Sequence, residues 1–148
     1  MQLVRRLEFD AGHRLPRHAG KCRHVHGHRY RVELVIEGPE QVDPDGYRRG
    51  MAIDFGTVRR LVGGWIDEHL DHRFLAAPDE DPALLDAIRR ASNDPAAVIV
   101  CPLGPPTAEN LAAWILQMAQ SLLPAPWVVQ VTVFETPNCW AVARSVAR

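Results

Sequence analysis

Two histidine-bearing segments constrain this chain more than any other feature of its sequence. Arg29–Gly38 alternates apolar with polar residues, which predicts a half-buried strand. If that strand begins near His26, then His26 and His28 point to the same face, because side chains of a strand alternate between faces. His13 follows a second strand-like run, Leu3–Phe9, and an antiparallel pairing of the two runs would bring His13 opposite the pair.

Three neutral imidazoles with one open position describe a catalytic zinc site, whereas a structural zinc site takes a fourth side chain. Cys22 could supply that fourth ligand, so the residues alone leave the type of site open. His18 and His24 are rival ligands, and His24 has the same parity along the chain as the later pair. The alternative interpretation is a set of surface histidines in a basic loop.

Two short motifs around these histidines resemble those of a known family. The run Phe9–Leu15 reads FDAGHRL, and Cys22 stands three residues before His26-Gly27-His28. This pattern resembles the 6-pyruvoyl-tetrahydropterin synthase family. The spacing after the cysteine is similar to that of its 6-carboxy-tetrahydropterin synthase branch, which serves queuosine synthesis. The resemblance implies that Zn²⁺ is bound by His13, His26 and His28, and it leaves His24 out.

Composition bounds the class of protein. The 148 residues are 47% hydrophobic, which suits one compact domain over residues 1–148. No apolar run reaches the roughly 18 residues of a membrane span, and the N-terminus lacks the apolar core of a signal peptide. The three cysteines have irregular spacing, which fits a reducing cytosol better than a disulfide framework. We therefore expect a cytoplasmic protein with no membrane partner.

The distribution of charge indicates a small anionic ligand. The net charge of −1 gives the whole protein no field for nucleic acid. Between His13 and Arg31, however, the chain carries six lysines and arginines and no acidic residue. A basic patch beside a metal suits a polyanionic substrate such as a triphosphate, although a solvated basic loop would look the same.

The remaining pattern predicts an α+β domain. We expect Asp54 to cap a helix that Leu70–Leu75 closes, and Thr107 to cap a second long amphipathic helix. A shorter helix is predicted at Pro82–Ala91. Strands are predicted at Arg48–Ile53, Ala96–Cys101, Trp127–Glu135 and Cys139–Val146. An antiparallel sheet would bury one face under the two main helices, and the resemblance implies the tunnelling fold (T-fold).

Two groups could move protons. Cys22 lies among cations and near the metal ligands, which would favour its thiolate, although it could equally be a small loop cysteine. Asp71-His72 pairs a carboxylate with an imidazole, as a general acid–base group needs, or else it is a helix end with a favourable histidine. In the family, a cysteine at this position abstracts the proton and an Asp-His pair completes the relay.

Glu135 has the most informative context of the carboxylates. It ends the apolar row Val129, Val131 and Val133, so it should be partly buried and need a donor partner, unless it reaches solvent at the strand end. A pterin offers two parallel N–H donors that match a carboxylate. In the family, a glutamate here anchors the pterin and is also a partner in the proton relay, so the resemblance implies a catalytic role for Glu135 as well. Thr107 and Glu109 resemble the Thr-x-Glu helix start that lines this pocket, although helix capping explains them as well.

These observations predict a zinc-dependent lyase-type enzyme acting on 7,8-dihydroneopterin triphosphate. The resemblance favours the carboxy branch, whose products are 6-carboxytetrahydropterin, acetaldehyde and triphosphate. The alternative within the family is 6-pyruvoyl-tetrahydropterin synthase, which releases triphosphate only. The alternative from another class is a non-catalytic pterin- or metal-binding protein. The resemblance also implies a homohexamer of two stacked trimers, with sites between subunits.

Overall fold

A computed structural model describes residues 1–38, 46–47, 49–123 and 128–145. The strands are β1 (Gln2–His13), β2 (His26–Glu37), β3 (Arg73–Ala76), β4 (Val98–Val100), β5 (Val128–Thr136) and β6 (Cys139–Arg144). The helices are α1 (Phe55–Val58), α2 (Gly64–His69), α3 (Pro82–Ser92) and α4 (Ala108–Leu122). Three single-turn elements are η1 (Lys21–Arg23), the π-helical η2 (Arg59–Gly63) and η3 (Pro95–Ala97). Among the described residues, no helix has the length and apolar character needed to cross a membrane.

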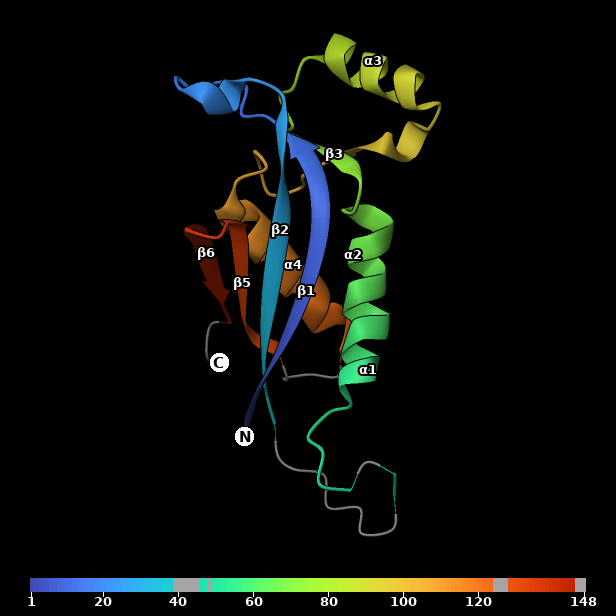
Figure 1. Cartoon of the computed structure of the whole chain (residues 1–148), viewed down its shortest axis with the longest axis vertical. Helices are drawn as coiled ribbons and strands as arrows, with labels where there is room; N and C mark the ends of the chain where they lie inside the picture. Colours follow the sequence, from blue (N-terminus) through green and yellow to red (C-terminus); the bar gives the residue numbers. More distant parts are fainter. Residues whose placement is uncertain (39–45, 48, 124–127, 146–148) are drawn as a thin grey trace.

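The described strands form one sheet in the order β4-β3-β1-β2-β5-β6. Strands β1 and β2 make a long antiparallel ribbon, which Figure 1 shows in blue and which β5 and β6 extend with antiparallel pairs. Strands β3 and β4 join the other side of β1 in parallel. The α+β class is thus confirmed. The sheet is mixed, however, because only four of its six described strands pair in the expected antiparallel way.

The ribbon buries one face because its apolar residues alternate with charged ones. Leu7, Phe9 and Ala11 of β1 and the even-numbered residues from Tyr30 to Ile36 of β2 point into the core. The α1–α2 segment and α4 cover that face, as predicted (Figure 1). Their buried residues are Val58, Val62, Ile66, Leu70, Leu111, Ala112, Ile115, Leu116 and Ala119.

Both predicted helix caps are confirmed. The Asp54 carboxylate accepts a hydrogen bond from the Gly56 amide at 2.7 Å, and the Thr107 hydroxyl accepts one from the Asn110 amide at 3.3 Å. Between α1 and α2 the helix widens into the π-turn η2, which ends at Gly63. Glycine has a low helix propensity, so the Gly63-Gly64 pair weakens the α-helix at this point, and here the helix departs from regular α-helical geometry.

Two expected elements were wrong. Leu70–Leu75 does not simply close the helix: α2 ends at His69, and Arg73–Ala76 forms the buried strand β3. The chain turns into β3 at His72, whose φ of 57° lies in the left-handed region. Arg48–Ile53 is not a strand, since its described residues 49–53 form a turn and bends. Trp127 and Val146, at the ends of two other expected strands, lie outside the described residues.

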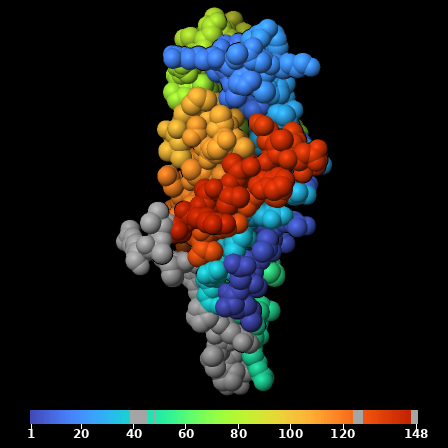
Figure 2. Space-filling view, turned by 90° about the vertical axis from the view of Figure 1, so that its left-hand side faces the viewer, coloured from blue at the N-terminus to red at the C-terminus, as the bar shows by residue number. Residues whose placement is uncertain are grey.

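The segment from β3 to β4 forms a second, smaller core. Phe74 and Ala76 of β3 pack with Leu85 of α3 and Val98 of β4. The predicted short helix is confirmed as α3, capped by Asp81. The strand predicted at Ala96–Cys101 is present as the shorter β4, because Ala96 and Ala97 belong to the preceding turn η3. In Figure 2 the yellow-green atoms of the region around α3 lie beside the blue loop that joins β1 to β2, at one end of the molecule.

Candidate metal centre

Three histidines meet at the end of the β1–β2 ribbon. His13 pairs with His26 across the ribbon, and Ala11 pairs with His28, so all three rings lie on the core face. One ring nitrogen from each histidine lies within 4.8 Å of those of the other two. The predicted antiparallel pairing is confirmed, with the difference that His13 is the last residue of β1 rather than a residue after it.

Hydrogen bonds fix the orientation of two of these rings. His13 Nδ1 lies 2.9 Å from the carbonyl oxygen of Pro106, and His26 Nδ1 lies 2.7 Å from that of His24. A carbonyl oxygen only accepts, so each Nδ1 carries the proton and each Nε2 presents a lone pair. The two Nε2 atoms lie 3.1 Å apart. Two lone pairs at this distance repel unless a cation lies between them, and this arrangement fits a bound metal ion.

The environment also favours the neutral form of His13 and of His28. Burial lowers the pKa of His13, the Pro106 carbonyl opposes this shift and the other two imidazoles add to it, so that the pKa is about 4. Burial likewise lowers the pKa of His28, against an opposing effect of Glu135. A histidine must be deprotonated to bind a metal, so lowered pKa values keep the site ready at neutral pH.

Tyr30 packs against the triad from the core side, and it was not predicted as part of the site. Its ring is fully buried, and its hydroxyl lies 3.3 Å from His13 Nδ1. It packs edge-on against both His13 and His28. The signal was available, because Tyr30 follows His28 by two residues and must therefore point to the same face.

The rival ligands do not join this group. Among the described residues, His13, His26 and His28 bring their ligand atoms together, without His18, His24 or Cys22. His24 contributes its backbone carbonyl instead of its ring. Cys22 lies half-buried on η1, in the loop between the ribbon strands. The described part of the chain therefore offers three ligands and leaves the thiol separate from them.

Glu135 lies directly beside the triad. Its Oε1 atom is 3.7 Å from His13 Nε2 and 3.9 Å from His28 Nε2. The side chain is 28% exposed, which confirms the predicted partial burial. Strand β5 shifts its register between Phe134 and Thr136, and Glu135 occupies that irregularity. These distances are too long for hydrogen bonds, so the carboxylate oxygens remain able to accept N–H groups of a ligand.

Asp71 and His72 form the predicted carboxylate–imidazole pair. His72 Nδ1 lies 2.8 Å from Asp71 Oδ2, while Asp71 Oδ1 accepts the backbone N–H of Asp10 at 2.8 Å. His72 in turn donates its backbone N–H to the Asp10 carbonyl at 2.6 Å. The left-handed turn at His72 lets these adjacent residues face each other. The nearby His69, at the end of α2, places Nδ1 3.0 Å from the Trp65 carbonyl.

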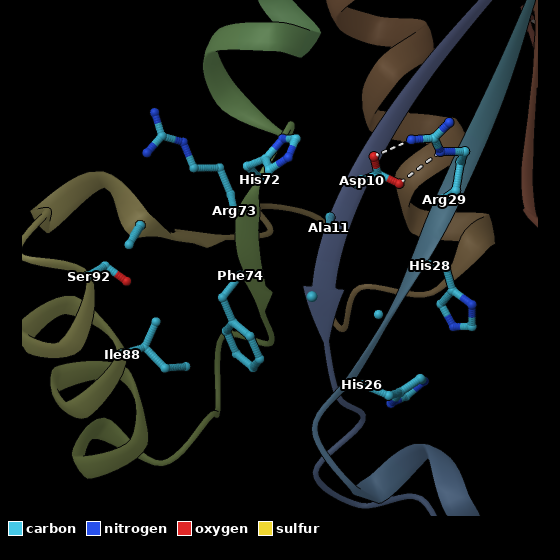
Figure 3. Close-up of a pocket in the computed structure, with 13 residues that line it drawn as sticks. Asp10, Ala11, His26, His28, Arg29, His72, Arg73, Phe74, Ile88 and Ser92 are labelled. Atoms are coloured by element: carbon cyan, nitrogen blue, oxygen red, sulfur yellow. Dashed lines mark hydrogen bonds and ion pairs between the residues drawn. The ribbon is translucent and has the colours of Figure 1, made fainter.

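The chain does not bring this pair to its own triad. His72 lies near the side chains of Asp10 and Arg29 (Figure 3). Because side chains alternate along a strand, these two residues point to the face of the ribbon opposite His28. There His72 borders a pocket of about 670 Å³ between the ribbon and α3, whose lining also includes His26 and His28, although the rings of these two residues lie on the other side of the strands in Figure 3. The His72 side chain is 78% exposed. The dyad is therefore preformed, and it faces away from the metal ligands of the same chain.

The expected basic patch is only partly realised. Acidic residues from other segments reach three of its arginines, and the pairs are Arg14–Glu80, Arg17–Asp79 and Arg29–Asp10. The Arg29 guanidinium lowers the pKa of Asp10 through two hydrogen bonds. A run of cations in sequence thus gives a surface of mixed charge.

The start of α4 lies next to the triad, because Pro106 supplies the carbonyl that holds His13. Thr107, expected near the ligand pocket, caps α4 with its hydroxyl. Glu109 is exposed in the first turn of that helix. This confirms the capping interpretation of Thr107, while the role of both residues toward a ligand stays a prediction.

Known proteins resemble this chain over nearly its whole length. The family model described as 6-pyruvoyl tetrahydropterin synthase matches residues 2–145. A protein of Rickettsia bellii named 6-carboxy-5,6,7,8-tetrahydropterin synthase is 32% identical over 146 residues, covering 95% of this chain and 97% of the relative. An uncharacterized protein of Wolinella succinogenes has a similar structure, with a TM-score of 0.79, 24% identity and coverage of 99% and 98% of the two chains. The 6-pyruvoyl tetrahydropterin synthase of Caenorhabditis elegans superposes with a TM-score of 0.69 at 21% identity, covering 99% and 96%. Both likenesses show the tunnelling fold.

Proposed function

The chain belongs to the 6-pyruvoyl tetrahydropterin synthase family, and within it we propose that this protein is a zinc-dependent 6-carboxy-5,6,7,8-tetrahydropterin synthase. It would convert 7,8-dihydroneopterin triphosphate to 6-carboxytetrahydropterin, acetaldehyde and triphosphate, as a cytoplasmic lyase of queuosine biosynthesis. The name of the Rickettsia relative and the three-residue spacing between Cys22 and His26 support this branch. The observation that carries the metal-dependent part is the facing pair of Nε2 atoms of His13 and His26.

The histidine triad would hold the zinc ion. Zinc prefers imidazole nitrogen, and three protein ligands with an open position are typical of its catalytic sites. Bound there, zinc acts as a Lewis acid that polarises a substrate oxygen. The arrangement of one buried and two half-buried rings leaves one side of the triad accessible, and Glu135 borders it.

Glu135 and Cys22 have separate tasks in this proposal. The Glu135 carboxylate would accept the two N–H groups on the pyrimidinone edge of the pterin, which fixes the ring beside the triad. The Cys22 thiolate would remove a proton from the side chain of the bound substrate. Its place on a loop outside the ligand set supports the base role over a fourth-ligand role.

The Asp71–His72 dyad would complete the proton relay from a neighbouring copy of the chain. Asp71 holds the His72 ring through Nδ1, which leaves Nε2 to take up or release a proton. Because the dyad faces away from its own triad, it has to serve the triad of another subunit. Strand β6 forms one edge of the described sheet, with Trp140 and Val142 exposed on it, and unpaired edges favour association. We therefore propose the homohexamer, which light scattering at micromolar concentration tests; a monomeric mass would contradict it.

The product assay tests the proposed reaction. The purified protein is incubated with 7,8-dihydroneopterin triphosphate, with and without a chelator, and the pterin product is identified by mass while aldehydes are trapped. Acetaldehyde and 6-carboxytetrahydropterin that disappear with the chelator are the expected result. Triphosphate release with the three-carbon side chain retained would identify the pyruvoyl branch. Absence of triphosphate release from metal-loaded protein would leave a binding protein instead of an enzyme.

A further inference from the structure

Glu80 is the only buried acidic residue among those that the structure describes. Its side chain is 0% exposed and accepts three hydrogen bonds from Arg14, from Nε at 3.0 and 2.9 Å and from Nη2 at 2.8 Å. The backbone N–H of Asp81 adds a fourth bond at 2.8 Å. A buried carboxylate with every oxygen engaged is held in one orientation, and it holds the guanidinium in one orientation as well.

Arg14 connects the buried Glu80 carboxylate to the loop that carries Cys22. It directly follows His13, and its Nη1 atom donates to the backbone carbonyl of Arg23 at 3.3 Å. The next residue, Leu15, donates its backbone N–H to the Cys22 carbonyl at 2.8 Å. Glu80, Arg14 and Arg23 thus form a continuous set of contacts that ends one residue from the thiol.

The histidine triad has its own supports. His13 and His26 are fixed by the ribbon register and by their bonds to Pro106 and His24. None of these contacts involves Glu80. Loss of the Glu80–Arg14 contact would therefore act on the loop and its thiol and leave the metal ligands in place.

We propose that Glu80, acting through Arg14, is a positioning residue that fixes the Cys22 thiol relative to the histidine triad. This inference rests on the proposed function of Cys22 as the base. Proton removal requires the thiol to lie within hydrogen-bond reach of one particular carbon-bound proton, so a loop shift of about 1 Å costs turnover more than binding. The segment before α3, in the region that lies beside the blue loop in Figure 2, is thereby part of the active-site architecture.

The test uses Glu80→Gln, which keeps the size of the side chain but removes its charge and one acceptor. We expect kcat to fall at least tenfold, KM to change less than twofold, and metal content to stay at the wild-type level. In the resting enzyme, iodoacetamide should label Cys22 at least threefold faster, as followed by peptide mass. Arg14→Lys keeps the positive charge and removes the planar fork, so it should reproduce these changes; it also serves if Glu80→Gln fails to fold.

A second ion pair between the same two segments supplies the matched control. Arg17 and Asp79 lie 2.9 Å apart, but their side chains are 87% and 43% exposed. Asp79→Asn should leave kcat, KM and Cys22 labelling within twofold of wild type, because exposed pairs contribute little. Wild-type kcat and labelling in folded Glu80→Gln would overturn the proposal, as would a kcat loss that accompanies metal loss. If the wild type shows no turnover, the proposed function fails. The labelling of Cys22 then still tests the positioning role: faster labelling in Glu80→Gln than in the wild type supports it, and an unchanged rate contradicts it.

Discussion

His13 and His26 face each other with their Nε2 atoms 3.1 Å apart, while both Nδ1 atoms are turned toward backbone carbonyl oxygens. The protons of both rings are therefore committed away from the space between them. Repulsion between the two lone pairs becomes attraction once a cation binds, so the fold holds these ligands in an arrangement that metal binding stabilises.

Loss of either histidine of β2 should abolish metal binding. We expect about one zinc ion per chain in the wild type and almost none in His26→Ala or His28→Ala, because two remaining ligands are too few. His24→Ala is the control, since His24 offers only its backbone carbonyl and should keep full occupancy. Elemental analysis of the purified proteins measures this, and full occupancy in both ligand variants would rule out the site.

The metal-free protein should lose stability in acid because of His13. Its pKa is about 4 in the folded chain against an ordinary value of 6.5, so the unfolded chain binds more protons between these values. The stability contribution of neutral His13 is complete above pH 6.5 and is lost as pH falls toward 4. Its size is up to about 3 kcal/mol. Urea unfolding of chelator-treated protein at several pH values measures how steeply the free energy of unfolding falls with pH. This dependence should be weaker in His13→Gln, and an equal dependence in both proteins would show that His13 is not its cause.

Cys22→Ala should separate chemistry from folding. We expect the variant to keep its metal and its unfolding temperature, because Cys22 is not among the ligand group, and to lose turnover by at least about a hundredfold. Cys139→Ala, which removes an exposed thiol of β6, should retain turnover. Loss of metal in Cys22→Ala would instead show that the thiol is a fourth ligand and that the site is structural.

Glu135→Gln should weaken substrate binding. An amide nitrogen cannot accept the second N–H group of the pterin, so we expect kcat/KM to fall by about ten- to a hundredfold, mostly through KM. Metal content should not change, because Glu135 is not in the ligand group. Glu33→Gln is the control, since Glu33 pairs with Arg6 on the opposite face of the ribbon. Equal steady-state constants for both variants would remove Glu135 from the pterin site.

Cys101 should resist alkylation in the folded protein. Burial raises the pKa of its thiol to about 12, and the residue is 1% exposed. Only about one molecule in ten thousand then carries a thiolate at about pH 8. Peptide mass analysis after iodoacetamide should find exposed Cys139 labelled and Cys101 unlabelled until a denaturant is added. Equal labelling rates in the native state would show that Cys101 is accessible.

The grouping of the three histidines was predictable because the signal is local. Strand alternation places His26 and His28 on one face, and a single antiparallel pairing brings His13 to them. The position of Cys22 relative to the ligands was not predictable, because it depends on the backbone path of a loop. The three histidines that the family resemblance selected are the ones that the fold brings together, where parity alone also allowed His24.

The features that were missed depend on contacts between distant segments. Strand β3 is four residues long and pairs in parallel with β1, so neither alternation nor a hairpin turn marks it. Glu80 looks like one more acid in an acidic loop until Arg14, 66 residues away, is placed against it. Likewise, no periodicity indicates that Asp71 and His72 face away from the triad, because that follows from the path of the chain into β3.

The pairing of His13 with His26 means that the loop holding Cys22 starts and finishes at the ligands themselves. Residues can be inserted into or deleted from that loop without moving a ligand, whereas one residue added inside either strand would turn its histidines to the other face. The histidine group and the Cys22 thiol therefore lie on parts of the chain that can vary in length independently. A change of length in this one hairpin loop would shift the thiol while the three histidines keep their places on the strands.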